Sequence, residues 1–499
     1  MNSFAQSAIR TSNETLTENG HPAFRSTSNA LLDLFGVIGG LRNAEPERIT
    51  RLFDEAYRVN PLLATKILFY SRDIRGGLGE RETFRTILKH AAVYHPECVE
   101  PNLDLIGVYG RFDDLYCLIN TPLEDKMWEA MKTQLNEDLK NLEEGNSVSL
   151  LGKWIKTPDA SSQNTRTLGI LTAKKLGYSV YDFKRILRSL RKEIDIVERH
   201  MSAGEWDQIK YSEVPSRAMF LYKNAFARHN EKDFTAFIQK AVTGEVKINS
   251  STLFPYDITE KYLDRFSAME ESENLTYEAQ WRQLPNYIEE GKNVMVLADV
   301  SGSMSGRPMA SSVGLALYFA ERNTGDFHNL FMTFTSTPKV VKVKGETLAS
   351  KIESIAGADW GGSTNLVEAC LLILKIAKEN NVPEEDMPLS LVIISDMEID
   401  AADDSTTSLY PLLESKFALA GYKMPTLVFW NVNSRSDTFL IDHDRPGVLL
   451  CSGQSPSTFK QLMASIGMSA EEMMLNTLNS DRYDAISISD YEKEGQIEF

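Results

Sequence analysis

The sequence predicts an α + α/β protein, in which an N-terminal ring or solenoid of helical repeats is followed by a doubly wound, Rossmann-like domain. In residues 1–285 apolar residues recur at the three-and-four spacing of amphipathic helices. From about Asn293 the pattern changes to short apolar runs that alternate with helical segments. Such alternation is typical of a mostly parallel sheet covered by helices. Glycine and proline turn signals separate the segments in both parts.

The N-terminal part is expected to consist of short helices joined by short loops. Pro46 suits the first position of one of them, because a proline lacks the N–H that is unsatisfied there. The helices are predicted at Asn29–Leu41, Pro46–Tyr57, Asn60–Tyr70, Glu80–Tyr94, Leu123–Leu142, Leu168–Lys174, Val180–Met201, Pro215–His229 and Glu231–Val242. Many short helices favour a repeat layer or a ring, although the sequence has no strict period.

The C-terminal part is expected to alternate strands and helices. Strands are predicted at 293–301, 329–335, 339–343, 389–397, 426–432 and 447–453. Helices are predicted at 310–322, 347–355, 365–379 and 408–420, with another from Pro456. The acidic stretch Glu270–Lys292 is interpreted as an irregular boundary between domains. The resulting division is a helical domain at 1–285, an α/β domain at 290–480 and an acidic tail at 481–499.

Composition favours a folded cytoplasmic protein with free thiols. No window approaches the roughly 18 apolar residues of a membrane span, and the four cysteines show no metal-binding spacing. The net charge of −17 argues against indiscriminate nucleic-acid binding, because phosphates would be repelled at long range. The charge is uneven, however, since residues 151–192 carry ten basic and two acidic side chains.

Polar residues at the ends of predicted strands indicate a metal site. Asp299, Ser301 and Ser303 follow the first strand of the sheet, Thr364 precedes a helix, and Asp396 ends another strong strand. Two carboxylates and three hydroxyls form an all-oxygen set, which suits a divalent cation such as Mg²⁺. The alternative is an ordinary strand-to-helix turn in which a serine caps the helix. The site contains no poised His, Cys or Lys, so an enzyme is not predicted.

These motifs resemble a known family. The pattern D-x-S-x-S…T…D resembles the metal-ion-dependent adhesion site (MIDAS) of von Willebrand factor A (vWA) domains. Together with RDIRGGLGER at 72–81 and YGRFDDL at 109–115, it resembles the Ro autoantigen family. That family joins a TROVE ring of HEAT-like helical repeats to a vWA domain. The resemblance is closer to uncharacterised bacterial, phage and plant relatives, through LGKWIK at 151–156, VPS at 214–216 and ISDMEID at 394–400.

The resemblance implies roles for the metal-site residues. Ser301, Ser303 and Thr364 would ligate the ion directly. Asp299 and Asp396 would act directly or through water, leaving one position open for an oxygen from a partner.

The Ro resemblance also implies RNA binding. Members hold small structured or misfolded RNAs on a basic face of the ring and thread single-stranded ends through its hole. The basic candidates are Lys153, Lys156, Arg166, Lys174, Lys175, Lys184, Arg185, Arg188, Arg191 and Lys192. Lys184, Arg188 and Arg191 fall at helical spacing, and Trp154, Tyr178 and Tyr181 could stack on unpaired bases. The alternative is a solvated helix face without a ligand.

Three functions follow from these features. The first is a Ro-like ribonucleoprotein in which the ring binds RNA and the metal site recruits a second partner or closes the ring. The second is a protein–protein adaptor, in which the metal accepts a carboxylate from a partner and no RNA is involved. The third, a metal-dependent hydrolase, ranks last because no second metal or base is visible. No membrane partner is expected. The arginines of 72–81 are expected to pair with Asp73, Glu80, Asp113 and Asp114, and the seven dispersed histidines predict no metal or catalytic pattern.

Overall fold

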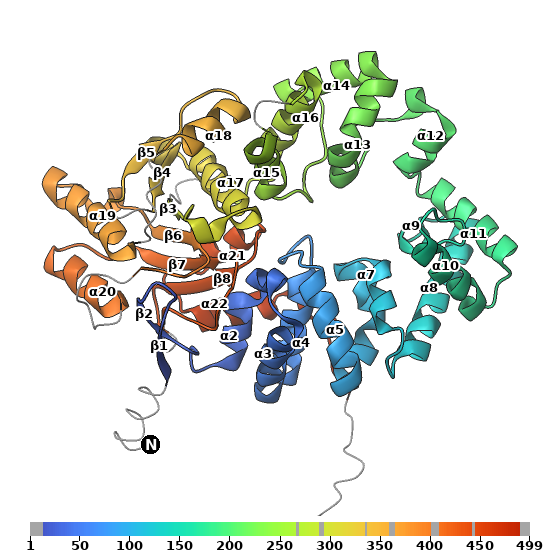
Figure 1. Cartoon of the computed structure of the whole chain (residues 1–499), viewed down its shortest axis with the longest axis horizontal. Helices are drawn as coiled ribbons and strands as arrows, with labels where there is room; N and C mark the ends of the chain where they lie inside the picture. Colours follow the sequence, from blue (N-terminus) through green and yellow to red (C-terminus); the bar gives the residue numbers. More distant parts are fainter. Residues whose placement is uncertain are drawn as a thin grey trace, which may run out of the picture.

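The computed structural model describes residues 13–265, 269–288, 294–334, 337–358, 365–400, 409–441 and 445–489. Figure 1 shows an arc of helices whose two ends both reach one α/β layer. This arrangement confirms the α + α/β class. The four cysteines are unpaired, as predicted. None of the helices in the described ranges combines the length and the apolar character needed to cross a membrane.

The arc follows the helical periodicity of the sequence. Its α-helices are α2 (Ala30–Val37), α3 (Pro46–Val59), α4 (Pro61–Arg72), α5 (Glu82–Tyr94), α6 (Pro96–Val99), α7 (Ile106–Tyr109), α8 (Glu124–Glu144), α9 (Leu151–Trp154), α10 (Gln163–Leu176), α11 (Val180–Glu193), α12 (Val197–Ala203), α13 (Ser216–His229), α14 (Glu231–Thr243), α15 (Pro255–Arg265) and α16 (Glu271–Arg282). Short 3₁₀ turns include η1 (Ile38–Asn43), η2 (Glu100–Leu105) and η3 (Phe112–Leu118).

Two predictions about the arc are wrong in detail. The single helix expected at Val180–Met201 is two helices, because Asp195 adopts a left-handed conformation (φ 50°) that ends α11 before α12 begins. The stretch expected to be irregular, Glu270–Lys292, contains α16. Its glutamates are not a solvated run, since Glu273 pairs with Lys223 of α13.

The first described residues include two strands that the sequence analysis did not predict. β1 (Glu14–Leu16) and β2 (Pro22–Phe24) pair antiparallel as a short hairpin. The hairpin lies against the α/β layer, where Phe24 exchanges backbone hydrogen bonds with Phe439. The part predicted to be entirely helical therefore carries a small β element at its start.

The sheet has six strands in the order β5-β4-β3-β6-β7-β8. The strands are β3 (Val294–Ala298), β4 (Leu330–Thr333), β5 (Val340–Lys342), β6 (Ser390–Ser395), β7 (Thr426–Asn431) and β8 (Val448–Ser452). All pairs are parallel except β4 with β5. Counted from β3 the order is 3-2-1-4-5-6, so the topological switch point lies between β3 and β6. The continuous apolar runs reflect burial on both faces.

The helices of the α/β part are α17 (Arg307–Arg322), α18 (Leu348–Ala356), α19 (Leu366–Asn380), α20 (Leu409–Leu419), α21 (Thr458–Ala464) and α22 (Ala470–Leu478). α17 packs on β3, β4 and β6, whereas β8 is covered by α22 and by α2 from the arc. The first helix of the arc is thus part of the cover of the sheet.

Both ends of the arc are hydrogen-bonded to the α/β layer. At the first end Gly39 N donates to Ser452 Oγ at 2.9 Å. At the other end Thr259 of α15 donates to the carbonyl of Ala310 in α17 at 2.7 Å. Gln454 Oε1 lies between them and accepts from Arg42 at 2.8 Å and from Arg307 at 2.9 Å. The helical arc and the α/β layer therefore form a closed ring.

The segment after α22 also joins the core. Residues 481–499 are predicted to be an acidic tail, but the described part, 481–489, packs against the arc. Tyr483 is buried and stacks on Tyr109 with ring centroids 5.6 Å apart. Ser487 N donates to the side chain of Asn102 at 3.1 Å. Residues 481–489 therefore reinforce α7 and η2.

Gly39 is expected to be intolerant of any side chain. A Cβ there would lie 2.5 Å from Gly453 N and 2.6 Å from Ser452 C, and these backbone atoms cannot move aside. We expect Gly39→Ala to lower the free energy of unfolding by about 1–3 kcal/mol through overpacking. Urea denaturation would measure the change. Gly36→Ala is the matched control, because its Cβ would meet Leu450 at an ordinary 3.5 Å. Equal stability of the two variants would contradict the close approach at Gly39.

Candidate functional site

The carboxyl ends of β3 and β6 bring two predicted metal ligands to one edge of the sheet. Asp299 follows β3, Asp396 follows β6, and the two strands are parallel neighbours. Both carboxylates are buried. Asp299 N donates to the carbonyl of Ile394 at 3.0 Å, which extends the strand pairing up to the site. The site lies at the topological switch point, where doubly wound sheets bind ligands.

Asp299 is held by its neighbours. Its Oδ1 accepts from Ser301 N at 2.8 Å, and its Oδ2 accepts from the hydroxyl of Ser395 at 2.6 Å. Burial raises the pKa of Asp299, the hydrogen bonds from Ser395 and Ser301 oppose this, and the nearby charge of Asp396 adds to the rise. Two buried carboxylates beside each other repel, so a cation between them would relieve both burial and repulsion.

The serine hydroxyls of the first loop are available for ligation. Ser301 Oγ and Ser303 Oγ lie 3.0 Å apart. Ser301 precedes η5 (Gly302–Met304) but makes no side-chain capping bond to it. Ser301 therefore does not act as a helix cap, which was the alternative interpretation of this turn. Thr364, the fifth predicted ligand, lies outside the described residues.

Sequence reasoning missed a cation at this site. Arg435 Nη1 lies 3.4 Å from Asp396 Oδ2, and its Nη2 lies 2.8 Å from Glu18 at the tip of the hairpin. Glu18 N in turn donates to the buried Glu398 at 2.7 Å. No spacing in the sequence could connect Glu18 with Arg435. The hairpin and the strand ends are thereby linked around Asp396.

A cluster of cations lies where α4, α5, η3 and α9 meet. The Arg111 cluster comprises Arg72, Arg81, Arg85, Arg111, Lys153 and Lys156, around the carboxylates of Glu82, Asp113 and Asp114. Asp114 binds Arg72 and Arg85, each at 2.7 Å, and Asp113 binds Lys156 at 3.3 Å. The cluster contains six cations and three carboxylates, an excess of three positive charges among these side chains.

The charges of the Arg111 cluster shift the pKa values of its side chains. Although burial opposes it, the charges of Lys156, Arg85 and Arg81 hold the pKa of Asp113 below its ordinary value. Burial and the charge of Arg72 lower the pKa of Arg111.

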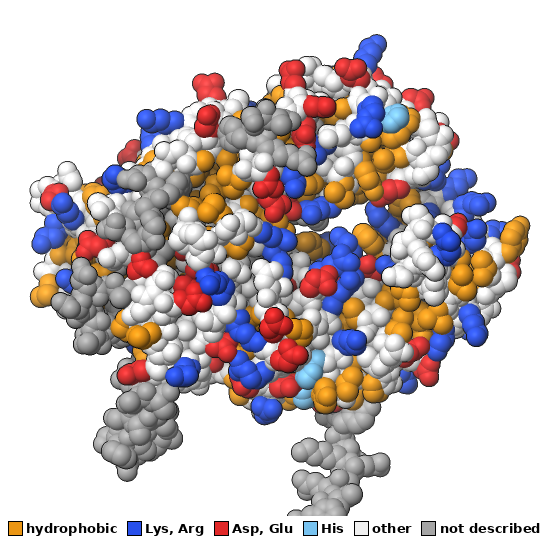
Figure 2. Space-filling model, viewed as in Figure 1, with side chains coloured by type: hydrophobic (Ala, Val, Ile, Leu, Met, Phe, Trp, Pro, Cys, Tyr) orange, Lys and Arg blue, Asp and Glu red, His pale blue; other side chains and the backbone are white. Residues whose placement is uncertain are grey.

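Two of the cations lie close to one aromatic ring. The Arg111 guanidinium lies 4.2 Å from the centre of the Trp154 ring, and Lys153 Nζ lies 5.6 Å from it. Figure 2 shows a narrow opening through the molecule, with Lys and Arg side chains at its border.

Some of the predicted RNA-binding side chains form ion pairs or hydrogen bonds within the protein, and others form no ion pair with the described residues. Engaged side chains are Lys156 with Asp113, Lys175 with Glu124 and Asp125, Lys184 with Asp159, Arg185 with Asp182, Arg191 with the carbonyl of Gly152, and Arg166 with the carbonyl of Ala160. Lys174, Arg188 and Lys192 are exposed and form no ion pair with the described residues. Lys184 and Arg191 thus turn toward 152–159, and Arg188 alone of that predicted face is free.

The predicted aromatic stacking residues differ in accessibility. Tyr181 is 76% exposed, whereas Tyr178 stacks on Phe183 with centroids 6.4 Å apart. Trp154 belongs to the Arg111 cluster. Of the three, Tyr181 is the most open to an unpaired base.

The ion pairs predicted for the arginine-rich loop are confirmed for Asp113 and Asp114 but are wrong for Asp73 and Glu80. Arg72 pairs with Asp114, and Arg81 lies 3.9 Å from Asp113. Asp73 and Glu80 pair with arginines outside the loop, Arg482 and Arg42. The loop therefore joins the arc to the closure of the ring and to the segment after α22.

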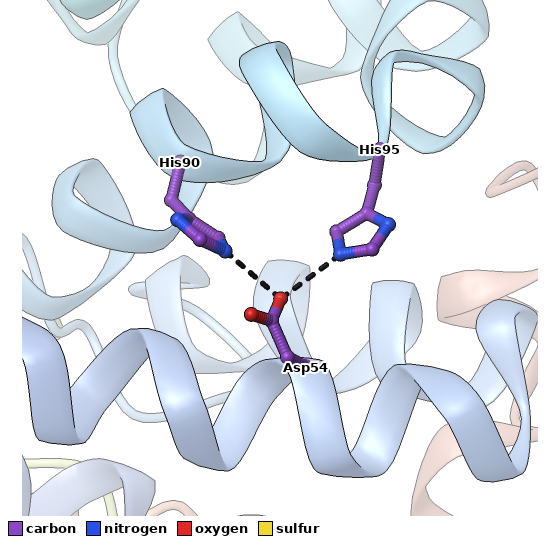
Figure 3. Close-up of side chains that lie close together, drawn as sticks. All are labelled: Asp54, His90 and His95. Carbon is purple, nitrogen blue, oxygen red and sulfur yellow. Dashed lines mark hydrogen bonds and ion pairs between the residues drawn. The ribbon is translucent and has the colours of Figure 1, made fainter.

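The histidines are not all dispersed, contrary to the sequence analysis. His90 and His95 both lie against Asp54 of α3 (Figure 3). The spacing of five residues is not a helical repeat, so it gave no signal. The cluster exists because α5 ends between the two histidines.

Comparison with known proteins relates parts of both the arc and the α/β layer to domains without an assigned function. Residues 293–496 match a domain of unknown function (DUF7788), and residues 17–129 and 171–292 match another (DUF2828). The chain is also 27% identical to an uncharacterized protein, L728, of Acanthamoeba polyphaga mimivirus. That alignment covers 96% of this chain and 91% of the viral protein. The resemblance extends over both the arc and the sheet.

Proposed function

We propose that the protein is a Ro-like RNA-binding protein, in which the arc is a ring of HEAT-like repeats and the α/β part is a vWA domain. The observation that carries this proposal is the Arg111 cluster, with its excess of positive charge around Trp154. Single-stranded RNA binds to surfaces that combine cations for the phosphates with aromatic rings for the bases. The net charge of −17 disfavours indiscriminate binding, but a local basic cluster can still attract phosphates because fields are screened beyond about 8–10 Å at ordinary salt.

The free cations of α10 and α11 extend the proposed surface. α9, which carries Lys153 and Trp154, contacts both η3 and α11. An RNA strand at the Arg111 cluster could therefore continue toward Arg188 and the neighbouring Lys174 and Lys192. Structured RNA would bind this outer face through its phosphates, and an unpaired end would bind Trp154.

The test is to purify the protein from cells at about 0.1 M salt, where phosphate contacts survive, and to sequence any bound RNA. We expect bound RNA in the wild type and little in Lys174→Glu/Arg188→Glu/Lys192→Glu. The control, Lys378→Glu/Lys416→Glu/Lys423→Glu, makes the same charge change on exposed residues of the α19–α20 region. Protein free of RNA, which also takes up none from a mixture of structured and single-stranded RNAs, would reject the proposal.

The second candidate is a metal-dependent protein adaptor, favoured by the site at the switch point. Asp299, Ser301, Ser303 and Asp396 would hold a Mg²⁺ ion, with Thr364 as a further ligand, and a partner's carboxylate would complete its coordination. Arg435 would lie beside that carboxylate and favour an anionic ligand. A protein partner that is lost on chelation, from a preparation without RNA, would distinguish this function from the first.

Magnesium is expected to stabilise the folded protein. Mg²⁺ at about 100 times its Kd should raise the free energy of unfolding by about 2.7 kcal/mol, because only the folded chain presents the assembled site. Asp299→Asn should abolish this increase. Thermal unfolding with Mg²⁺ and with EDTA would measure it, and Asp326→Asn on the surface is the control. A Mg²⁺ effect that survives in Asp299→Asn would place the ion elsewhere.

A further inference from the structure

The junction between α5 and α6 turns two histidines toward α3. His90 is in the last turns of α5, and His95 follows the helix end at Tyr94. Pro96 cannot continue a helix and disfavours helical geometry at the residue before it. His95 accordingly leaves the helix (φ −142°, ψ 51°) while its N–H still caps the carbonyl of Ala91 at 2.8 Å. This break places both imidazoles over one side chain of α3.

The three side chains converge on one oxygen atom. Asp54 Oδ1 lies 2.8 Å from His90 Nε2 and 2.9 Å from His95 Nε2 (Figure 3). The three potential ligand atoms all lie within 4.8 Å of one another. The side chains of His90, His95 and Asp54 are 17%, 20% and 26% exposed. They are therefore packed well enough to be ordered and still reachable from solvent.

Surrounding groups fix the orientation of both imidazoles. The ring of His95 lies 4.1 Å from that of Tyr57, and the ring of His90 lies 4.7 Å from that of Tyr94. His95 Nδ1 faces Glu97 Oε1 at 3.9 Å, and Tyr57 donates to the same Glu97 oxygen at 2.7 Å. A histidine that binds a metal through one nitrogen commonly directs the other toward a carboxylate, which orients the ring.

We propose that Asp54, His90 and His95 bind a transition-metal ion of the Zn²⁺ class, at a site separate from the one at Asp299. Two imidazole nitrogens and one carboxylate oxygen suit zinc or a similar borderline metal, whereas Mg²⁺ prefers oxygen ligands. Without metal the two imidazoles donate their Nε2 protons to Asp54. When Zn²⁺ binds through Nε2, each neutral imidazole carries its one proton on Nδ1 instead, so the rings change tautomer without a net loss of protons.

The required movement is small. Ligands about 2.1 Å from a tetrahedral zinc lie about 3.4 Å apart, so each imidazole would withdraw from Asp54 by about half an ångström. The two imidazole nitrogens, which lie within 4.8 Å of each other, would have to adopt the same spacing. With neutral imidazoles the charged groups at the site are Asp54 and Glu97, and both attract a cation. Three protein ligands leave at least one position for water or for an outside donor.

The test is zinc binding by the full-length protein, stripped of metal and kept in excess Mg²⁺ so that oxygen sites stay occupied. We expect the wild type to bind one more Zn²⁺ than His90→Gln/His95→Gln. The affinity of this site should fall by more than about 100-fold in the variant, since even an outer partner of a ligand accounts for about 10- to 100-fold. Asp54→Asn should weaken binding in the same direction. His229→Ala changes an exposed histidine that has no carboxylate partner among the described residues; it is the control and should bind as the wild type does.

Cobalt and heat provide independent readouts. Co²⁺ bound at this site should give the visible absorption of a nitrogen- and oxygen-ligated ion, and Zn²⁺ should raise the melting temperature of the wild type but not of the double variant. Circular dichroism of each variant establishes that it folds. Equal Zn²⁺ stoichiometry in the wild type and the folded double variant would overturn the proposal. A Co²⁺ spectrum unchanged from that of the aqueous ion would also overturn it.

Discussion

Replacing Asp114 with alanine is expected to lower the free energy of unfolding by about 3–5 kcal/mol, the range for breaking a buried ion pair from one side. Asp114 is fully buried and binds Arg72, which is itself only 4% exposed, as well as Arg85. It also accepts from the backbone N–H of Arg111 at 3.0 Å. Removing the carboxylate leaves the buried Arg72 uncompensated and Arg85 with Asp113 alone, within a cluster that already has excess positive charge. Urea denaturation would measure the loss.

Two variants test whether burial of the ion pair is the cause of the expected loss of stability. Asp125→Ala removes a carboxylate that is 96% exposed and pairs with Lys175, so its cost should be below about 1 kcal/mol. Asp114→Ala/Arg72→Met removes both partners of the buried pair, and we expect it to recover part of the lost stability. A cost for Asp114→Ala no larger than that of Asp125→Ala would show that the cluster does not depend on this carboxylate.

The Arg111 cluster is expected to dominate affinity for single-stranded RNA. Trp154→Ala should weaken binding of a short oligouridine by roughly 1–3 kcal/mol, or about 5- to 150-fold, through loss of base stacking. It should leave the salt dependence unchanged. Arg111→Gln/Lys153→Gln should instead flatten the slope of log affinity against log salt by roughly 1.4, about 0.7 for each phosphate that is no longer neutralised. Fluorescence anisotropy at several salt concentrations would measure both effects.

These two signatures separate an interface from a structural role. A variant that merely loosened the fold would lower affinity and melting temperature together and would not alter stacking and salt dependence separately. Lys378→Gln/Lys423→Gln provides the control for removal of two charges elsewhere. Wild-type affinity and slope in all variants would remove the Arg111 cluster from the interface and leave the metal-dependent adaptor as the better proposal.

The sheet could be predicted because a strand that is buried on both faces appears in the sequence as a continuous apolar run. β6, for example, occupies Ser390–Ser395 within the expected 389–397. The arc was less predictable where local signals conflict with packing. The acidic residues Glu273 and Glu278 suggested a solvent-exposed, irregular segment. In the structure they belong to α16, in which Tyr277 and Trp281 are buried. Such a helix is stabilised by its packing and not by its own composition.

The candidate sites also differ in how well they could be predicted from the sequence. The convergence of Asp299 and Asp396 could be predicted because both follow strands of one sheet, and the ends of parallel neighbours meet. The group of Asp54, His90 and His95 could not, since it depends on how α3 packs against α5. Arg435 was hidden for a similar reason, because its approach to Asp396 depends on the loop after β7 and on the position of the hairpin.

Closure of the ring during synthesis must wait until distant parts of the chain have both been made. Gly39 and Ser452, which are hydrogen-bonded, are 413 residues apart in the chain. At a synthesis rate of about 5–20 residues per second, α2 emerges roughly 20–80 s before β8, the strand that covers its apolar face. Non-local pairing of this kind is slow to form and exposes apolar surface in the meantime. The face of α2 that packs on β8 therefore stays uncovered until β8 is made, and the full protection of α2 from hydrogen exchange is expected only after that.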